Sequence, residues 1–179
     1  MPLFWYFVEA IWFILPAYAA NGLVTLIKGT HPIDRNKKYF DGEPIFGPGK
    51  TIEGFIIGCF LGALIATIQM IAYNYIPWEQ APVKLYIVNM SPILGFILGL
   101  GAMTGDLVGS FIKRRLKIER GGPAPLLDQE DFLIGALFFT FLFVNIRLEW
   151  VIILLLVTPI FHLVANIIAY LIKAKKEPY

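Results

Sequence analysis

The strongest candidates for chemistry in this chain are two aspartates, Asp128 and Asp131, in the segment P-L-L-D-Q-E-D-F. Carboxylates at this spacing can point the same way at a helix N-terminus. Such a pair can hold one or two Mg²⁺ ions, which prefer carboxylate and phosphate oxygens. The same pair also suits a helix N-cap with an acidic first turn, which complements the helix dipole. The spacing leaves both interpretations open.

A second candidate segment places Asp106, Ser110 and Lys113 at positions i, i+4 and i+7, which share one helix face. An ionisable residue inside an apolar span is costly and is a functional hypothesis by default. A salt bridge to a basic neighbour is the structural alternative for Asp106. The run of Lys113, Arg114 and Arg115, taken alone, would be an interfacial anchor or a surface for anionic lipid.

The third candidate segment, F-G-P-G-K-T, superficially resembles a phosphate-binding P-loop. The spacing excludes a P-loop, because a glycine would be needed where Pro44 stands and no strand precedes the segment. The backbone of Gly47 and Gly49, with Lys50 and Thr51, could still contact a phosphate at a helix N-terminus. A capped helix start, with Thr51 as the cap, is an equally good interpretation.

Composition indicates the kind of scaffold that must position these residues. The chain is 58% hydrophobic and 16% charged, with a mean hydropathy of +0.69. A soluble domain has about 45–50% apolar and about 25% charged residues. The single cysteine, Cys59, lies inside an apolar run, which excludes a disulfide framework and a thiolate metal site.

The apolar runs predict an all-α integral membrane protein with one domain, residues 1–179. A spanning helix needs about 20 mainly apolar residues. We predict five transmembrane helices, at residues 3–27, 55–76, 87–112, 129–146 and 149–172. The last two cannot be one span, because a helix of that length would be far longer than the membrane is thick. No basic residue precedes Lys28, so the first run is expected to be a permanent helix rather than a cleaved signal.

Charge distribution predicts the orientation. Two long loops, 28–53 and 113–128, and the C-terminal tail hold all but two of the 15 lysines and arginines. Basic residues collect on the cytoplasmic side. We therefore expect the N-terminus outside, the C-terminus and both loops in the cytoplasm, and a multi-pass protein of the cell membrane. Small residues spaced four apart should let its helices approach closely; they are Gly54, Gly58, Gly62, Ser91, Gly95, Gly99, Gly101, Gly105 and Gly109.

The three segments together resemble the CDP-archaeol synthases, the membrane cytidylyltransferases of archaeal phospholipid synthesis. The likeness rests on FDGEPIFGPGKTIEG, GDLVGSFIKRRL and PLLDQEDFLIGA, and it spans nearly the whole chain. The last two segments are also similar to a compressed CDP-diacylglycerol synthase signature. The matching residues are Ser110, Lys113, Arg114, Gly121, Gly122, Asp128 and Asp131. The signature's histidine and Lys-Asp pair are missing, so only its basic pair and two aspartates are carried over.

The resemblance implies Mg²⁺-dependent transfer of CMP from CTP to 2,3-di-O-geranylgeranylglyceryl phosphate, by in-line attack at the α-phosphorus. It implies catalytic roles for Asp106, Lys113, Asp128 and Asp131, with the three aspartates as metal ligands. Asp106 could instead tether a basic residue. Substrate contacts are expected from Gly47, Gly49, Lys50, Thr51, Ser110, Arg114, Arg115, Gly121 and Gly122. No nucleic-acid partner is expected, and the sequence leaves the oligomeric state open.

The alternative from another class is a non-enzymatic transporter or channel subunit, which the intramembrane Glu9 and Asp106 could support. The absence of an internal repeat argues against it, as does the gathering of Gly, Lys and Asp in two loops on the same side. A CDP-alcohol phosphotransferase is excluded because only Asp41-Gly42 of its motif occurs.

Overall fold

A computed structural model describes residues 2–119, 122 and 124–171 of the chain. Within these residues the fold is all-helical, and β pairing is limited to two isolated bridges in the first long loop. The α-helices are α1 (Leu3–Leu23), α2 (Ile52–Ala72), α3 (Pro92–Arg115), α4 (Leu127–Thr140) and α5 (Leu148–Leu171). Short 3-10 turns lie at Val24–Leu26, Tyr73–Tyr75 and Trp78–Gln80.

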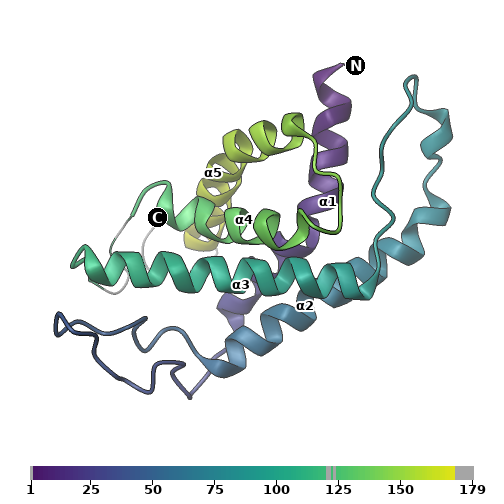
Figure 1. The fold of residues 1–179 in the computed structure, drawn as a ribbon. Coiled ribbons are helices and arrows are strands. Elements are labelled where there is room, and N and C mark those ends of the chain that lie inside the picture. The colour runs from purple at the N-terminus through teal and green to yellow at the C-terminus, as the bar shows by residue number, and fades with distance from the viewer. Residues whose placement is uncertain (1, 120–121, 123, 172–179) are drawn as a thin grey trace.

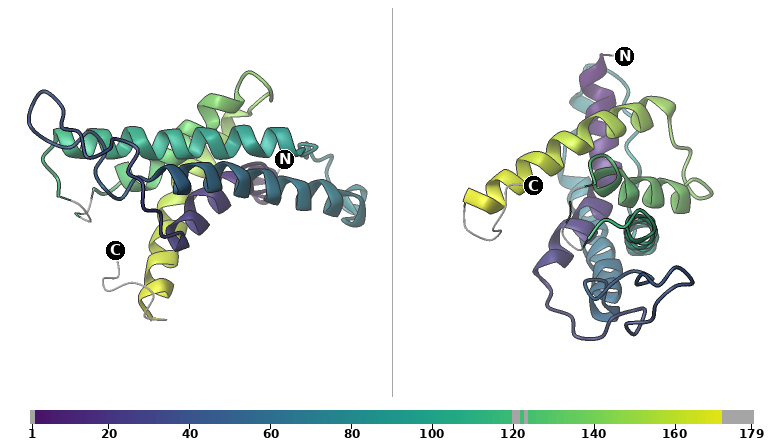
Figure 2. Two further views of the ribbon diagram at one scale, coloured as in Figure 1. Left: turned by 90° about the horizontal axis from the view of Figure 1, so that it is seen from below. Right: turned by 90° about the vertical axis from the view of Figure 1, so that its left-hand side faces the viewer.

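Helix α3 is central, with α2 packed along one side and α4 along another (Figure 1). Helix α1 packs against both α2 and α3, and α5 packs against α1 and α4. Because the chain runs up and down, the C-terminal end of α3, the N-terminal ends of α2 and α4, and the loop 27–51 meet at one end of the bundle. This end is on the left in Figure 1 and in the left view of Figure 2. The three polar segments therefore come together.

Among the described residues, three helical stretches are long and apolar enough to cross a membrane: Leu3–Leu26, Ile52–Tyr75 and Pro92–Arg115. Helix α5 is also apolar, over Leu148–Val164. Helix α4 differs from the predicted span 129–146, because it has 14 residues and ends at Thr140. Its length is about 21 Å, which is less than the roughly 30 Å of a hydrocarbon core.

Polar caps explain why two helices begin where they do and not where hydropathy placed the predicted spans. Helix α2 begins earlier than residue 55 because the Thr51 hydroxyl accepts the backbone N–H of Gly54 at 3.2 Å. Helix α3 begins later than residue 87 because the Ser91 hydroxyl accepts the N–H of Leu94 at 3.2 Å and a proline follows. Both arrangements satisfy N–H groups that a helix start otherwise leaves unpaired.

Glycines bring the backbones of α2, α3 and α4 into contact. A Cβ atom on Gly62 would lie 2.5 Å from the carbonyl oxygen of Gly95 and 3.0 Å from the Cα of Gly99. On the other side of α3, a Cβ on Gly101 would lie 2.6 Å from the carbonyl oxygen of Gly135. These approaches confirm that the small-residue spacing serves helix packing. They also fix α4 closely against the helix that carries Asp106.

At the end of the bundle opposite the loop 27–51, the buried carboxylate of Glu9 links three segments by hydrogen bonds. The Glu9 side chain accepts the N–H of Tyr86 at 2.6 Å, the indole N–H of Trp150 at 2.9 Å and a guanidinium N–H of Arg147 at 3.2 Å. These donors come from the α2–α3 connection, from α5 and from the turn before it. Glu9 thus bonds between helices, which is one of the roles expected for a polar residue in the first span.

Candidate active site

A pocket of about 550 Å³ lies between the loop 27–51 and the C-terminal end of α3. Its lining combines glycines and prolines of the loop with basic side chains of both segments. The lining residues are Glu43, Pro44, Phe46, Gly47, Pro48, Gly49, Lys50, Ser110, Lys113, Arg114, Lys117, Ile118 and Glu119. Six of the predicted substrate or catalytic residues are among them, although they come from segments about 60 residues apart in the sequence.

The loop wall of this pocket is shaped by Asp34, whose side chain is buried. Its carboxylate accepts backbone N–H groups from Asn36 at 3.0 Å, Phe46 at 3.0 Å and Gly47 at 2.8 Å. Burial alone would raise the pKa of Asp34, but the three N–H donors outweigh it and hold the pKa below its usual range. Gly47 has a φ of +95°, a conformation that favours glycine. Its N–H points at Asp34 rather than into the pocket.

Lys50 joins the loop to α3. Its ammonium nitrogen lies 2.5 Å from a carboxylate oxygen of Asp106, and both side chains are about one-quarter exposed. Asp106 therefore tethers a basic residue, as one of its two expected roles requires. The adjacent Thr51 caps α2. The capped helix start is thus present, and Lys50 is directed toward the site rather than into solvent.

A second pair of opposite charges joins α3 to α4. The Lys113 ammonium is hydrogen-bonded to Asp128, whose other carboxylate oxygen accepts the N–H of Ala124 at 3.1 Å. Asp128 lies in the first turn of α4, as expected for an acidic helix start. Ser110 is buried one turn before Lys113, and Arg114 has a buried Nε atom that makes no hydrogen bond with the described residues. Both side chains line the pocket.

Asp131 lies on the glycine face of α3. A Cβ atom on Gly109 would come within 2.8 Å of the Cβ of Asp131, and the backbone of Asp131 packs on Gly105. The charges of Lys50, Asp106 and Asp128 all act on the Asp131 carboxyl group. Gly105 and Gly109 thus make room for Asp131 and its helix. The sequence places these two glycines among the small residues that let helices approach closely, but it does not identify Asp131 as the residue that they accommodate.

The carboxylates of Asp106, Asp128 and Asp131 are close enough to influence one another, but they do not form a closed metal site. Among the residues that the structure describes, no three His, Cys, Asp or Glu side chains are grouped as ligands of one ion. Two of the three carboxylates, those of Asp106 and Asp128, hold lysines. Carboxylate oxygens are the donors that Mg²⁺ takes in proteins. The donor chemistry of these aspartates therefore fits Mg²⁺.

Arg115 and Gly122 stand apart from the pocket. The Arg115 guanidinium is 3.2 Å from Asp41 and donates to the carbonyl oxygen of Pro44 at 2.5 Å, so it faces the loop. Gly122 is outside the lining of the pocket, and its N–H donates to the carbonyl oxygen of Glu119 at 2.9 Å. Gly121 lies outside the described residues.

Sequence reasoning missed Asp34 and Asp41 as residues that shape the site. A signal exists for Asp34, because Asp-x-Asn is typical of a turn in which the aspartate side chain binds backbone N–H groups two residues on. The turn is closed by the N–H of Lys37 donating to the carbonyl oxygen of Asp34 at 2.9 Å, and its central residues, Arg35 and Asn36, have positive φ values of +51° and +59°. No local signal identifies Asp41 as the partner of an arginine 74 positions later.

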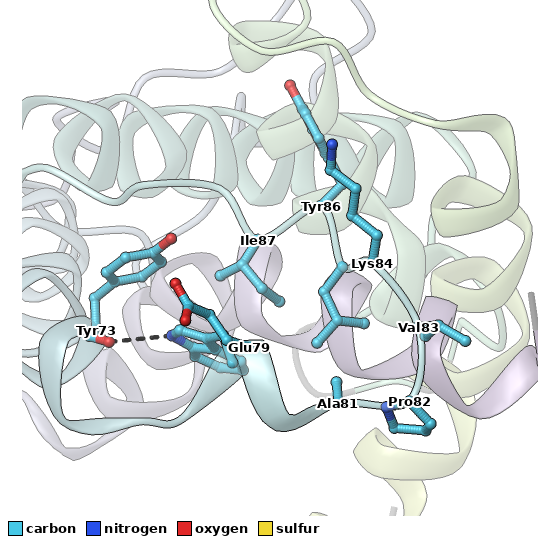
Figure 3. Close-up of a pocket in the computed structure, with 10 residues that line it drawn as sticks. Tyr73, Glu79, Ala81, Pro82, Val83, Lys84, Tyr86 and Ile87 are labelled. Atoms are coloured by element: carbon cyan, nitrogen blue, oxygen red, sulfur yellow. Dashed lines mark hydrogen bonds between the residues drawn. The ribbon is translucent and has the colours of Figure 1, made fainter.

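The other end of the bundle has a pocket of about 520 Å³, lined by the α2–α3 connection (Figure 3). Its charged lining residues are Glu79 and Lys84. The indole N–H of Trp78 donates to the carbonyl oxygen of Tyr73 at 3.1 Å, the dashed line in Figure 3. This pocket has no cluster of carboxylates and lysines. The loop end of the bundle is therefore the candidate active site.

Comparison with known proteins gives a consistent result. A family model described as CarS-like, CDP-archaeol synthase, matches residues 3–179. The CDP-archaeol synthase of Pyrococcus abyssi is 46% identical over 96% of this chain and 97% of its own length. That of Methanocaldococcus jannaschii is 45% identical over 90% of each chain. A solved structure titled as an intramembrane enzyme for archaeal membrane lipids biosynthesis is 35% identical, with a TM-score of 0.75, over 89% of this chain and 94% of that one.

Proposed function

This chain belongs to the CDP-archaeol synthase family, and from that premise we propose that it is a CTP-dependent cytidylyltransferase of the membrane. Its substrates are CTP and an isoprenoid ether-lipid phosphate, 2,3-di-O-geranylgeranylglyceryl phosphate. A phosphate oxygen of the lipid forms a new bond to the α-phosphorus of CTP. The bond from that phosphorus to the bridging oxygen of the β-phosphate breaks, and pyrophosphate leaves with the electron pair. The product is a CDP-lipid.

The observation that carries the proposal is a pocket lined by basic side chains, two of which, Lys50 and Lys113, pair with Asp106 and Asp128. Lys50, Lys113, Arg114 and Lys117 supply positive charge on the pocket wall, which suits a triphosphate and a lipid phosphate together. Phosphoryl-type transfer depends on positioning and on neutralising charge, with little covalent chemistry from the protein. A pocket of this charge at the end of an apolar bundle matches a reaction between a soluble nucleotide and a membrane lipid.

We assign roles to the residues as follows. Lys50 and Lys113 orient the phosphates after exchanging their aspartate partners for phosphate oxygens. Arg114 holds the nucleotide phosphates, because its side chain lines the pocket, whereas that of the neighbouring Arg115 does not. Asp106, Asp128 and Asp131 would hold Mg²⁺. Bound there, Mg²⁺ would supply positive charge that neutralises the phosphates.

We place the site on the cytoplasmic side of a five-span bundle, with the N-terminus outside and the C-terminus in the cytoplasm. The basic residues of the loop 27–51 and of the α3 end support this placement, because they gather at one end of the helices. The shorter α4 completes its crossing through the turn after Thr140. A cytoplasmic site lets CTP enter from water while the two isoprenoid chains stay in the membrane.

The test is a transfer assay with purified protein in detergent, Mg²⁺, CTP labelled at the α-phosphate and the geranylgeranyl lipid phosphate. Label should move into the organic phase, and EDTA should abolish the transfer. Asp131→Asn should lose turnover while it melts like the wild type. Glu79→Gln, at the other end of the bundle, is the matched control and should keep full activity.

The same assay separates the enzyme from a transporter. No label in the organic phase, with protein that melts cooperatively, would overturn the cytidylyltransferase proposal. Normal activity of Asp131→Asn would remove Asp131 from the site while leaving the reaction in place. Thermal stabilisation by CTP with Mg²⁺ is a further expectation, since a ligand that binds only the folded protein raises its stability.

A further inference from the structure

We propose that Arg115 is a positioning residue that clamps the loop turn of residues 39–44 onto α3, and that it does not bind phosphate. The inference rests on the proposed function, because it concerns the wall of the CTP pocket. The inference assigns Arg115 a different role from that of Arg114, its neighbour in a run of three basic residues. The loop clamp is defined here as Arg115, Tyr39, Asp41 and Pro44.

The Arg115 side chain is engaged on its edges and its faces. Its Nε lies 3.2 Å from a carboxylate oxygen of Asp41, and an Nη donates to the carbonyl oxygen of Pro44 at 2.5 Å. The guanidinium carbon is 4.8 Å from the ring centroid of Tyr39 and 4.8 Å from that of Phe111. A planar guanidinium can pair with a carboxylate at its edge and stack on aromatic rings at its face. Three of these four partners belong to the loop.

The rest of the guanidinium is closed to the pocket. Its other Nη is buried and makes no hydrogen bond with the described residues. Arg115 is absent from the pocket lining, whereas Lys113 and Arg114 are part of it. Helix geometry explains the difference, since neighbouring positions point about 100° apart around the axis. Arg114 therefore faces the pocket and Arg115 faces the loop. A phosphate could reach Arg115 only after the loop clamp had opened.

The loop clamp acts on a turn that is already closed by its own backbone. The N–H of Tyr39 donates to the carbonyl oxygen of Glu43 at 2.8 Å, and the N–H of Ile45 donates to that of Lys37 at 3.2 Å. Pro44 is two residues before Phe46, whose N–H is held by Asp34. Fixing Pro44 on α3 thus fixes the segment that continues through Gly47 to Lys50. The pocket wall is held at Arg115, at Asp34 and at the Lys50–Asp106 pair.

A double-mutant cycle tests this assignment. Arg115→Gln should raise the KM for CTP about tenfold while kcat stays within about threefold, because the loop is displaced but no reacting group is removed. Asp41→Asn should act in the same direction. The double variant should be little worse than Arg115→Gln, since both changes open one clamp. Arg114→Gln is the matched control, and its effect should multiply with that of Asp41→Asn.

Hydrogen exchange supplies a readout that does not depend on activity. Arg115→Gln should lower the protection of the amides of residues 39–50 at least tenfold, whereas Arg114→Gln should leave them unchanged. Arg115→Lys should restore only part of the protection, because an ammonium cannot stack and pair as a guanidinium does. Unchanged protection in Arg115→Gln would overturn the clamp. So would a large loss of kcat that multiplies with Asp41→Asn, because Arg115 would then contact the substrate.

The two proposals fail separately. If the wild-type protein transfers no label from CTP, the proposed function is wrong, but the exchange measurement still decides whether Arg115 holds the loop. If transfer is normal and exchange in Arg115→Gln is unaltered, the cytidylyltransferase remains and the clamp is rejected.

Discussion

Gly109→Ala should damage the active site through a single added methyl group. The new Cβ would lie 2.8 Å from the Cβ of Asp131 and still closer to its carboxylate. The carboxylate can rotate away, but the Asp131 Cβ is fixed to the backbone of α4. Ordinary contact between the two carbons begins at 3.4 Å. The end of α4 must therefore move by about 0.6 Å, in an interface packed at crystal-like density.

The expected cost has two parts. Overpacking a well-packed interface costs about 1–3 kcal/mol of stability. A misplacement of a catalytic group by about 1 Å can cost up to about a hundredfold in rate. We therefore expect Gly109→Ala to lower kcat by roughly tenfold to a hundredfold, with a lower melting temperature and the bundle still folded.

Two other glycines serve as controls in the transfer and melting assays. Gly62→Ala meets the backbone of α3 far from the aspartates, so it should lower the melting temperature while its kcat, per folded molecule, stays within about threefold. Gly22→Ala, in α1, meets nothing within 4 Å and should be neutral or slightly stabilising. If Gly109→Ala has the kcat of Gly62→Ala, the packing of Asp131 on α3 does not set its catalytic position.

Three further predictions concern other parts of the molecule. Glu9→Gln should destabilise the protein by about 1–3 kcal/mol, because a glutamine cannot accept all three N–H groups of Tyr86, Arg147 and Trp150 and leaves at least one unpaired. The kcat per folded molecule should be unchanged; chemical denaturation and the transfer assay measure the two. The depressed pKa of Asp34 means that its contribution to loop stability is present above pH 3.8, the ordinary pKa, and is lost as the pH falls through the lower folded value. Amide protection of residues 46 and 47 should follow that loss in the wild type, and in Asp34→Asn it should be low and independent of pH. Mg²⁺ and CTP should each tighten binding of the other, and calorimetry should show a much smaller effect in Asp128→Asn; equal coupling in both proteins would contradict the exchange of ion pairs.

The sequence predicted the helical bundle and the grouping of the three polar segments, because both follow from hydropathy and from up-and-down connection of helices. Helix starts were less accurate, since the hydroxyls of Thr51 and Ser91 decide them and hydropathy does not register a cap. The end of α4 at Thr140 was also not apparent, because the residues that follow remain apolar. The family resemblance, which rests on motifs in order along the chain, is confirmed.

Pairings within the site could not be predicted, for a physical reason. Lys50 and Asp106 are 56 positions apart, and many arrangements of charge on two loops satisfy the same composition. The direction of each side chain around α3 decides whether it enters the pocket or holds the loop. That direction depends on where the helix begins and on what packs against it. The neighbouring arginines therefore look equivalent in the sequence and differ in the fold.

The pairing of lysines with aspartates has a consequence for how the site is assembled. In each pair, the lysine ammonium is a group that could bind phosphate, and the aspartate carboxylate is a group that could bind Mg²⁺. Before substrate arrives, the two charges of each pair compensate each other, which limits the cost of partly burying them. If only the nucleotide bound, the aspartates would lose their lysine partners; if only Mg²⁺ bound, the lysines would lose their aspartate partners. In either case a partly buried charge would be left unpaired. Binding of both gives each charge of the two pairs a new partner. The nucleotide and the metal should therefore each increase the affinity of the protein for the other.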